Sequence, residues 1–433
     1  MAKLIIIGGG IVGAACALEA ASQGAEVVLA DAGLPGRATS AGAGIISPWS
    51  AHADDPELRS FTSTAAREYP ALVERLAEFG ATDVSYRKVG ALYPCEDAET
   101  TARAYANLRD QRENAAQIGD VRVLSGPEAR ELFPPLRDDL SAVYVPGAAR
   151  VDGRKIAAAL ARAAAALGAV IRDDPARLVM RDPVSRGSVS AGSVSGGSVA
   201  RDSAAGGSAV RGVEVAGEII EADTVVVAAG AWTSSVLEDA GLTDIGAAAK
   251  VTPQRGQIAH IAMPGHDTSE WPVVSPVGTG HYMLAFDDSR VVAGATRETG
   301  SGFDYRVTPG GLAEVLNEAI RVAPGLAAGT YIETRIGFRP ASPDGRPLLG
   351  AVPGVDGLVV ATGLGAEGLT AGPYMGAIAA KVALGVPADI DLTSFGPLRL
   401  PAQARPGYRG HLVACWWEGS IRDEPRRPCH GIT

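Results

Sequence analysis

The N-terminal stretch 4–31 carries the pattern that most constrains the fold of this chain. It consists of an apolar run, the sequence Gly-Gly-Gly-Ile-Val-Gly, an Ala-rich segment and a second apolar run that ends in an acid. This order predicts a buried strand, a tight glycine turn, a helix and a second strand. Gly8 permits the turn, Gly10 lets the backbone approach a pyrophosphate, and Gly13 lets the helix pack closely on the strand. Because a helix start favours phosphate and Asp31 has the spacing of a ribose ligand, the stretch predicts a dinucleotide site.

Composition and charge narrow the class of protein. Hydrophobic residues make up 46% of the 433 residues and charged residues 20%, which is typical of a soluble globular protein of about two or three domains. The net charge of -10, without any run of Lys and Arg, argues against nucleic-acid binding. The 4 scattered cysteines show no metal-ligand spacing, so we expect no metal site and a reducing compartment, the cytoplasm. No stretch is long and apolar enough to span a bilayer, so no transmembrane segment is expected.

Two later apolar runs extend the N-terminal pattern. Residues 224–229 run into Gly230, and residues 358–362 run into Gly363. Fully apolar strands that end in glycine are expected in a parallel sheet covered on both faces. Because ligands bind such sheets at the carboxyl ends of the strands, we expect the three glycine turns to meet at one ligand.

The segments between these strands contain helices and one low-complexity insert. Apolar residues at helical spacing predict helices over 56–79 and 99–117, and Asp152 is placed to cap a helix at 155–167. Residues 185–208 consist mainly of Gly, Ser, Val and Ala. Such a composition cannot bury enough apolar surface to offset its ordering entropy, so it predicts a disordered hairpin tip.

Four further motifs follow in order along the chain. They are Thr39-Ser40-Ala41-Gly42-Ala43-Gly44-Ile45, Ala228-Ala229-Gly230-Ala231-Trp232, Pro253-Gln254-Arg255-Gly256-Gln257, and Arg339-Pro340 with Asp344-Gly345-Arg346-Pro347. Together with the N-terminal unit, this ordered set resembles the D-amino-acid oxidase superfamily of FAD enzymes, and within it the glycine oxidase and sarcosine oxidase branch. The resemblance implies that the motif at 39–45 is a loop under the flavin and that the motif at 228–232 is a second cofactor turn. It also implies that 253–257 is a loop beside the active site and that 339–347 carries the substrate arginine.

The resemblance extends from about residue 4 to residue 398 and implies an α/β fold. A Rossmann-like FAD-binding domain is expected to be interleaved with an α+β substrate domain. The FAD-binding domain would comprise 1–49, 150–247 and 336–398, the substrate domain 50–149 and 248–335, and residues 399–433 would form a tail.

The family's cofactor positions carry over to the glycine turns and their neighbours. The backbone near Arg177 would hold the adenine side, and a helix N-terminus after the third turn would favour negative charge on the reduced flavin. The segment before Arg339 lacks the cysteine to which sarcosine oxidases attach flavin, so we expect non-covalent FAD. The implied cofactor residues are Gly8, Gly10, Ile11, Val12, Gly13, Ala30, Asp31, Arg37, Ala38, Ser40, Gly42, Ala43, Gly44, Arg177, Gly230, Gly363, Leu364, Gly365, Ala366, Glu367, Gly368, Leu369 and Thr370.

Two residues match the family's substrate positions. Arg339 matches an arginine that pairs bidentately with the substrate carboxylate, and Tyr282 matches a tyrosine at the same site. Glycine oxidases of this branch carry a second arginine in the final turn, where this chain has Ala366, which puts glycine itself in doubt as the substrate. His260 and His281 are expected to be ordinary surface histidines.

The resemblance implies oxidation of the C–N bond of a small amino acid to an imine, by hydride transfer to flavin. The amino acid would be a D-amino acid, glycine or an N-methyl amino acid, and oxygen, a quinone or another carrier would accept the electrons. A 2-hydroxy acid could serve as substrate in the same fold, since it also carries a carboxylate. A flavin-binding protein without turnover is the alternative of another class.

Overall fold

The computed structural model describes residues 1–50, 55–112, 115–181 and 208–399. A 6-stranded sheet forms its first layer, in the order β20-β22-β13-β1-β2-β9. These strands are β1 (Lys3–Ile7), β2 (Glu26–Ala30), β9 (Val170–Arg172), β13 (Thr224–Val227), β20 (Leu348–Ala351) and β22 (Leu358–Thr362). β1 pairs in parallel with β2 and β13, and β13 pairs in parallel with β22, so three strand ends followed by glycine meet at one edge. The predicted arrangement of these strands is confirmed.

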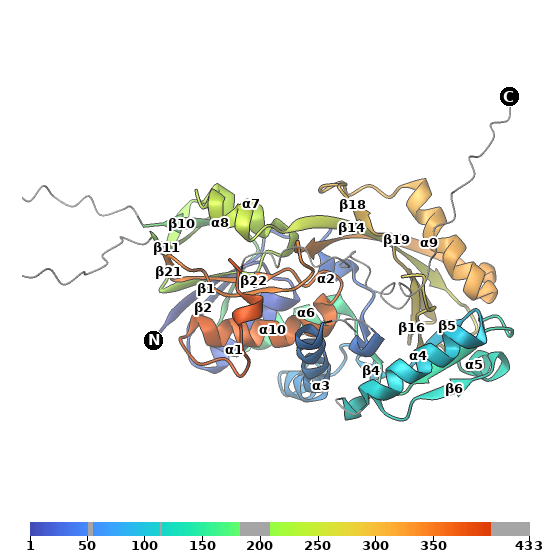
Figure 1. Ribbon diagram of the computed structural model, residues 1–433. Helices are drawn as coiled ribbons and strands as arrows, with labels where there is room; N and C mark the ends of the chain where they lie inside the picture. The colour runs from blue at the N-terminus through green and yellow to red at the C-terminus, as the bar shows by residue number, and fades with distance from the viewer. Residues whose placement is uncertain (51–54, 113–114, 182–207, 400–433) are drawn as a thin grey trace, which may run out of the picture.

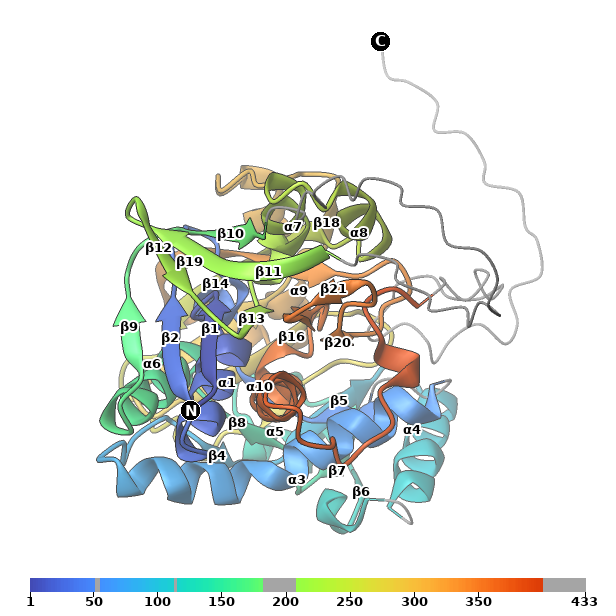
Figure 2. The same ribbon diagram turned by 90° about the vertical axis from the view of Figure 1, so that its left-hand side faces the viewer.

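Different layers cover the two faces of this sheet (Figures 1 and 2). Leu4 and Ile6 pack into a cluster with the helices, whereas Ile5 and Ile7 pack against strands. The helical layer comprises α1 (Ile11–Ser22), α3 (Pro56–Glu78), α6 (Gly153–Ala166) and α10 (Gly368–Ala383). The opposite layer is built on β10 (Ala176–Met180), β11 (Ser208–Val215), β12 (Glu218–Glu221) and β21 (Val355–Asp356), with α7 (Thr233–Asp239) and α8 (Thr243–Ala248) beside them. The alternation along β1 therefore fits a strand that is buried on both faces.

A 9-stranded sheet forms the other part of the described chain (Figure 1). Its strands are β5 (Ala91–Cys95), β6 (Arg122–Leu124), β7 (Ser141–Val145), β14 (Thr252–Ala262), β15 (Val273–Val274), β16 (Tyr282–Phe286), β17 (Arg290–Gly294), β18 (Glu298–Thr299) and β19 (Thr330–Ala341). The helices α4 (Ala98–Gln111), α5 (Gly126–Leu132) and α9 (Pro309–Val322) adjoin it, and β3 (Ile45–Ile46), β4 (Arg87–Lys88) and β8 (Ala149–Arg150) form a separate 3-stranded sheet. β14 and β19 pair along their whole length, so 253–257, expected as a loop, is strand.

Three further differences from the sequence expectations concern helices and histidines. The helix expected over 99–117 ends at Gln111. His260 is buried, with 1% of its surface exposed, and His281 is half-buried, so the expectation of surface histidines is wrong. Burial, aided by neighbouring arginines, lowers the pKa of His260 to about 3, which keeps its ring neutral.

The domain boundaries inferred from the sequence stay a prediction. α3, which those boundaries place in the substrate domain, contributes Phe61 to the helical cluster on the 6-stranded sheet. The hydroxyl of Tyr69 in α3 also donates to the carbonyl of Leu369 in α10. The insert 185–207 and the tail from residue 400 lie outside the described residues. No helix among the described residues is both long and apolar enough to cross a bilayer.

Candidate active site

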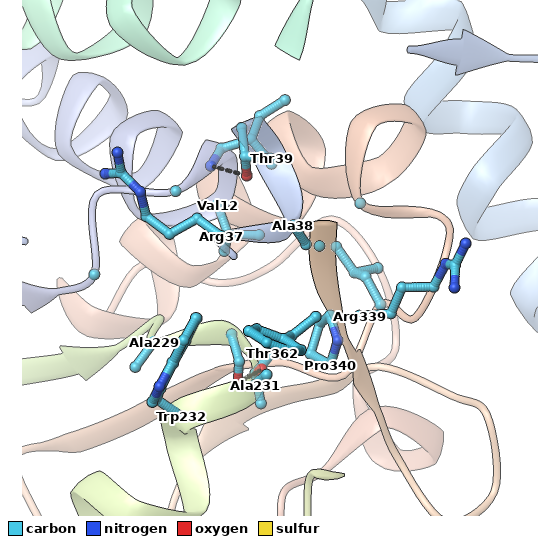
Figure 3. A pocket seen from close by; sticks show the side chains of 18 of the residues that line it. Val12, Arg37, Ala38, Thr39, Ala229, Ala231, Trp232, Arg339, Pro340 and Thr362 are labelled. Atoms are coloured by element: carbon cyan, nitrogen blue, oxygen red, sulfur yellow. Dashed lines mark hydrogen bonds between the residues drawn. The ribbon is translucent and has the colours of Figure 1, made fainter. Parts of the chain in front are cut away.

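The carboxyl ends of β1, β13 and β22 open on a cavity of about 470 Å³. Figure 3 shows Arg37 and Arg339 toward opposite sides of this cavity, with Thr362 between them. Most of the residues expected from the sequence line it. These are Gly8, Gly10, Ile11, Val12, Ala30, Asp31, Arg37, Ala38, Gly42, Ala43, Gly44, Arg177, Gly230, Tyr282, Arg339, Gly363, Leu364, Gly365, Ala366, Gly368 and Leu369.

The first glycine turn leaves no room for side chains. Gly8 has φ +107°, and a Cβ there would lie 2.5 Å from the carbonyl oxygen of Ala228. A Cβ on Gly13 would lie 1.9 Å from the carbonyl oxygen of Gly8, so Gly13 shapes the contact of helix and strand without lining the cavity. The helix begins at Ile11, whose N–H donates to Thr39 Oγ1 at 3.1 Å (Figure 3). The turn and the helix start therefore present backbone to the cavity, as phosphate binding requires.

Asp31 directly follows β2, and both of its carboxylate oxygens accept hydrogen bonds. Oδ2 accepts from Arg37 Nη1 at 2.5 Å, and Oδ1 accepts from the backbone N–H of Gly33 at 3.1 Å. Since a carboxylate has about four acceptor sites, these bonds orient it and leave lone pairs for ribose hydroxyls. Arg177 lies at the same cavity, but its side chain is mostly exposed and pairs with Glu214 at 3.3 Å.

Side-chain and backbone hydrogen bonds join the remaining turns around the cavity. Thr362 Oγ1 donates to the carbonyl oxygen of Gly230 at 3.0 Å, which ties the third turn to the second. The N–H of Gly365 donates to the carbonyl oxygen of Pro340 at 3.0 Å, which ties the third turn to β19. α10 begins directly after, at Gly368, so its N-terminus lies at the cavity wall. Three other predicted cofactor residues, Ser40, Glu367 and Thr370, do not line the cavity.

Arg339 and Tyr282 reach the cavity from the 9-stranded sheet. Arg339, on β19, donates from Nη1 to the carbonyl oxygen of Thr296 at 3.0 Å. A Cβ on Gly256, in the facing strand β14, would lie 2.7 Å from the same Nη1, so glycine makes room for the guanidinium. Tyr282 begins β16 and lies over Gly294 of β17. No carboxylate forms an ion pair with Arg339 among the residues that the structure describes.

Several residues at the cavity have no role predicted from the sequence. Thr39 and Trp232 lie inside motifs that the resemblance identified, so their positions were available but their side chains were not assigned a role. Arg297 carried no local signal, because it follows β17 in a short connection and no motif includes it. The antiparallel pairing of β17 with the preceding strand β16 brings it near Tyr282.

The residues around the cavity fit FAD. Glycines stand where a Cβ would strike backbone, a helix N-terminus adjoins the first turn, and Asp31 lies at the end of the second strand. Cys16 and Cys95 are buried, and neither lines the cavity, so neither is placed to attach a flavin covalently.

Residues 3–382 match the family model described as FAD dependent oxidoreductase, and the chain belongs to this family of enzymes. The resemblance to the D-amino-acid oxidase superfamily and the need for FAD are thereby confirmed. The crystal structure of iminodiacetate oxidase from Chelativorans sp. BNC1 superimposes with a TM-score of 0.81 at 44% identity, covering 91% of this chain and 98% of that one.

Two other relatives cover nearly the whole chain. The "uncharacterized oxidoreductase YurR" of Bacillus subtilis is 39% identical over 92% of this chain and 99% of its own length. The glycine oxidase of Geobacillus kaustophilus is 28% identical over 91% of this chain and 96% of its own length. Its crystal structure gives a TM-score of 0.76.

Proposed function

We propose that the protein oxidises the C–N bond of a small amino acid to an imine, with the substrate carboxylate bound by Arg339. The observation that carries this proposal is the placement of Arg339 at the side of the cavity opposite Arg37, the partner of Asp31. Its guanidinium has one backbone acceptor and, among the described side chains, no acidic partner. A planar fork with free N–H groups suits a carboxylate, which it binds through two parallel hydrogen bonds.

The relatives support an amine rather than another substrate. Glycine oxidase and iminodiacetate oxidase are named for compounds that carry nitrogen on the carbon next to a carboxylate. A 2-hydroxy acid would use Arg339 equally well and remains the alternative within the fold. The family match over residues 3–382 and the unobstructed cavity favour turnover over a purely binding role.

FAD bound in this cavity would supply the electron sink for oxidation of the C–N bond to an imine. The residues of this chain then need to bind and orient the amine rather than to transfer protons. Arg339 fixes the carboxylate, and Tyr282 bounds the space beside it. Residues of the third turn, Leu364 and Gly365, would lie against the flavin, with the α10 N-terminus favouring negative charge there.

The proposed reaction also needs an electron acceptor. Either oxygen or a carrier such as a quinone would reoxidise FAD. We expect the protein in the cytoplasm, since 4 scattered cysteines in 433 residues are not the pattern of a disulfide framework.

Anaerobic mixing of the purified protein with D-amino acids, glycine, N-methyl amino acids and 2-hydroxy acids tests the proposal. We expect bleaching of the flavin absorbance by an amine and no bleaching by the matched hydroxy acid. Admission of oxygen then distinguishes an oxidase, whose colour returns at once, from a dehydrogenase. Bleaching by the hydroxy acid alone would overturn the C–N assignment.

A further inference from the structure

Arg297 lies in the same cavity as Arg339 and, like it, has no carboxylate partner among the described residues. Arg297 lines the cavity from the connection between β17 and β18. Its Nη1 donates to the carbonyl oxygen of Gly280 at 2.6 Å, just as Arg339 Nη1 donates to the carbonyl oxygen of Thr296. Each guanidinium has five N–H groups, so each keeps donors beyond its single backbone bond.

The two guanidinium groups are close enough to repel each other. Burial, followed by the charge of Arg339, lowers the pKa of Arg297. An arginine nevertheless stays protonated in proteins, so Arg297 and Arg339 are both positively charged. Within the described part of the chain, neither charge forms an ion pair with a carboxylate.

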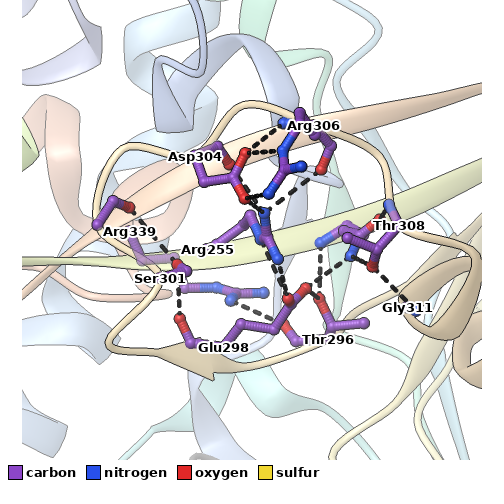
Figure 4. Close-up of polar contacts among 11 residues, drawn as sticks. Arg255, Thr296, Glu298, Ser301, Asp304, Arg306, Thr308, Gly311 and Arg339 are labelled. Carbon is purple, nitrogen blue, oxygen red and sulfur yellow. Dashed lines mark hydrogen bonds and ion pairs between the residues drawn. The ribbon is translucent and has the colours of Figure 1, made fainter.

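The carboxylate nearest to Arg297 in the sequence pairs with other side chains. Glu298 follows Arg297 directly, yet its oxygens accept from Arg255 at 2.5 and 3.0 Å and from Gln257 and Thr296, each at 2.7 Å (Figure 4). Asp304 likewise pairs with Arg255 and Arg306. The network thus holds the 296–298 backbone in place and neutralises Glu298, while the guanidinium of Arg297 lies at the cavity on the other side of the chain.

Since Arg297 and Arg339 both lack a carboxylate partner among the described residues, the cavity favours a substrate with more than one carboxylate. A buried cation without a counter-ion is costly, and a monocarboxylate would neutralise only one of the two. We propose that the substrate is a small amine with two carboxylates, one bound by Arg339 and the other by Arg297. This inference rests on the proposed C–N oxidation and names its substrate class. The second carboxylate would be attached either through the nitrogen or through the α-carbon side chain.

Matched substrate pairs test the inference in the FAD-loaded protein. N-(carboxymethyl)glycine is compared with N-methylglycine, and D-aspartate with D-alanine, by the concentration dependence of anaerobic flavin bleaching. We expect the dicarboxylate of one pair to be favoured roughly tenfold or more, the effect of one charge-assisted hydrogen bond, and that pair identifies the attachment. Equal efficiency within both pairs would overturn the inference.

The variant Arg297→Met removes the charge and keeps a long apolar side chain. It should lower the efficiency of flavin bleaching by the favoured dicarboxylate about tenfold or more and leave that of its monocarboxylate partner nearly unchanged. Arg297→Lys should recover part of the loss. Arg109→Met, on the exposed end of α4, is the matched control and should change neither. An equal loss for both members of a pair would assign Arg297 a general rather than a substrate-specific role.

Binding without turnover separates this inference from the proposed function. Oxydiacetate and methoxyacetate, ether analogues with two carboxylates and one, are titrated against the absorbance of the oxidised flavin. Oxydiacetate should bind more tightly, and Arg297→Met should remove that advantage without changing FAD content. If no amine bleaches the flavin, the proposed function fails, and the titration still decides whether Arg297 binds a second carboxylate.

Discussion

At the scale of single residues, the chemistry of the cavity depends on a few charges set among glycines. Arg339 is the charge on which the proposed function rests, and Gly256 gives its guanidinium the space it occupies. A lysine at position 339 would keep the charge but lose the planar fork that orients a carboxylate. The consequence should therefore appear in the placement of the substrate rather than in the binding of FAD.

Arg339→Lys should lower kcat/KM for the best amine. The loss of transition-state binding free energy should be about 1.5–3 kcal/mol, the range for hydrogen bonds to a charged group. Steady-state kinetics and the flavin-to-protein absorbance ratio measure the two quantities. Arg335→Lys, in the same strand but outside the cavity, is the control and should leave kcat/KM unchanged. A lysine variant with unaltered kcat/KM would show that Arg339 does not bind the substrate carboxylate.

Asp31 makes a separate contribution at the other side of the cavity. Asp31→Ala should weaken FAD binding by about 1.5–3 kcal/mol, since ribose hydroxyls lose a charged acceptor and Arg37 loses its partner. Titration of the apoprotein with FAD measures the dissociation constant. Asp173→Ala, an exposed residue after β9, is the control. An unchanged constant for Asp31→Ala would mean that the carboxylate does not reach the ribose.

The cysteines predict how FAD is held. Cys16 and Cys95 do not line the cavity, so acid precipitation should release intact FAD into the supernatant. The absorbance of the supernatant and the mass of the released compound measure this. Yellow colour that stays with the precipitate would contradict non-covalent binding.

At the scale of elements, the contact between α1 and β1 sets the geometry of the first turn. The contact is close because Gly13 lies against the carbonyl of Gly8. This feature could be predicted from the sequence, since the turn, the helix and both strands are consecutive in the chain. The pairing of β14 with β19 could not, because strands 68 or more residues apart leave no local pattern, and so 253–257 was expected as a loop.

Gly13→Ala should separate α1 from β1 and destabilise the protein by about 1–3 kcal/mol, the usual cost of inserting a methyl group into a close contact. Gly310→Ala is the matched control, because it also lies in the first turn of a helix but has no atom within 4 Å of the added Cβ. Denaturant unfolding of both variants measures the difference. Equal stability of the two variants would show that the helix shifts without cost.

At the scale of the whole molecule, the sequence predicted the family, and most of the residues it predicted line the cavity, but it did not predict the second unpaired arginine there. Ala366 suggested that Arg339 would be the main carboxylate ligand, because the family's second arginine is absent from the final turn. The fold brings Arg297 into the same cavity from another part of the chain. Long-range packing also places α3 against α10, which segment order alone would not indicate.

The Gly/Ser-rich insert separates β10 from β11 in the sequence. The flanking strands β10 and β11 pair directly, and the N–H of Arg181 donates to the carbonyl of Ala209 at 2.8 Å, so the described residues on either side of the insert lie close together. Deletion of 188–206 should leave Tm and FAD content unchanged, since a shorter loop is entropically no harder to close. A scrambled insert of equal length is the control. If the deletion lowers Tm while the scrambled insert does not, length matters, and if both lower it, the insert makes sequence-specific contacts.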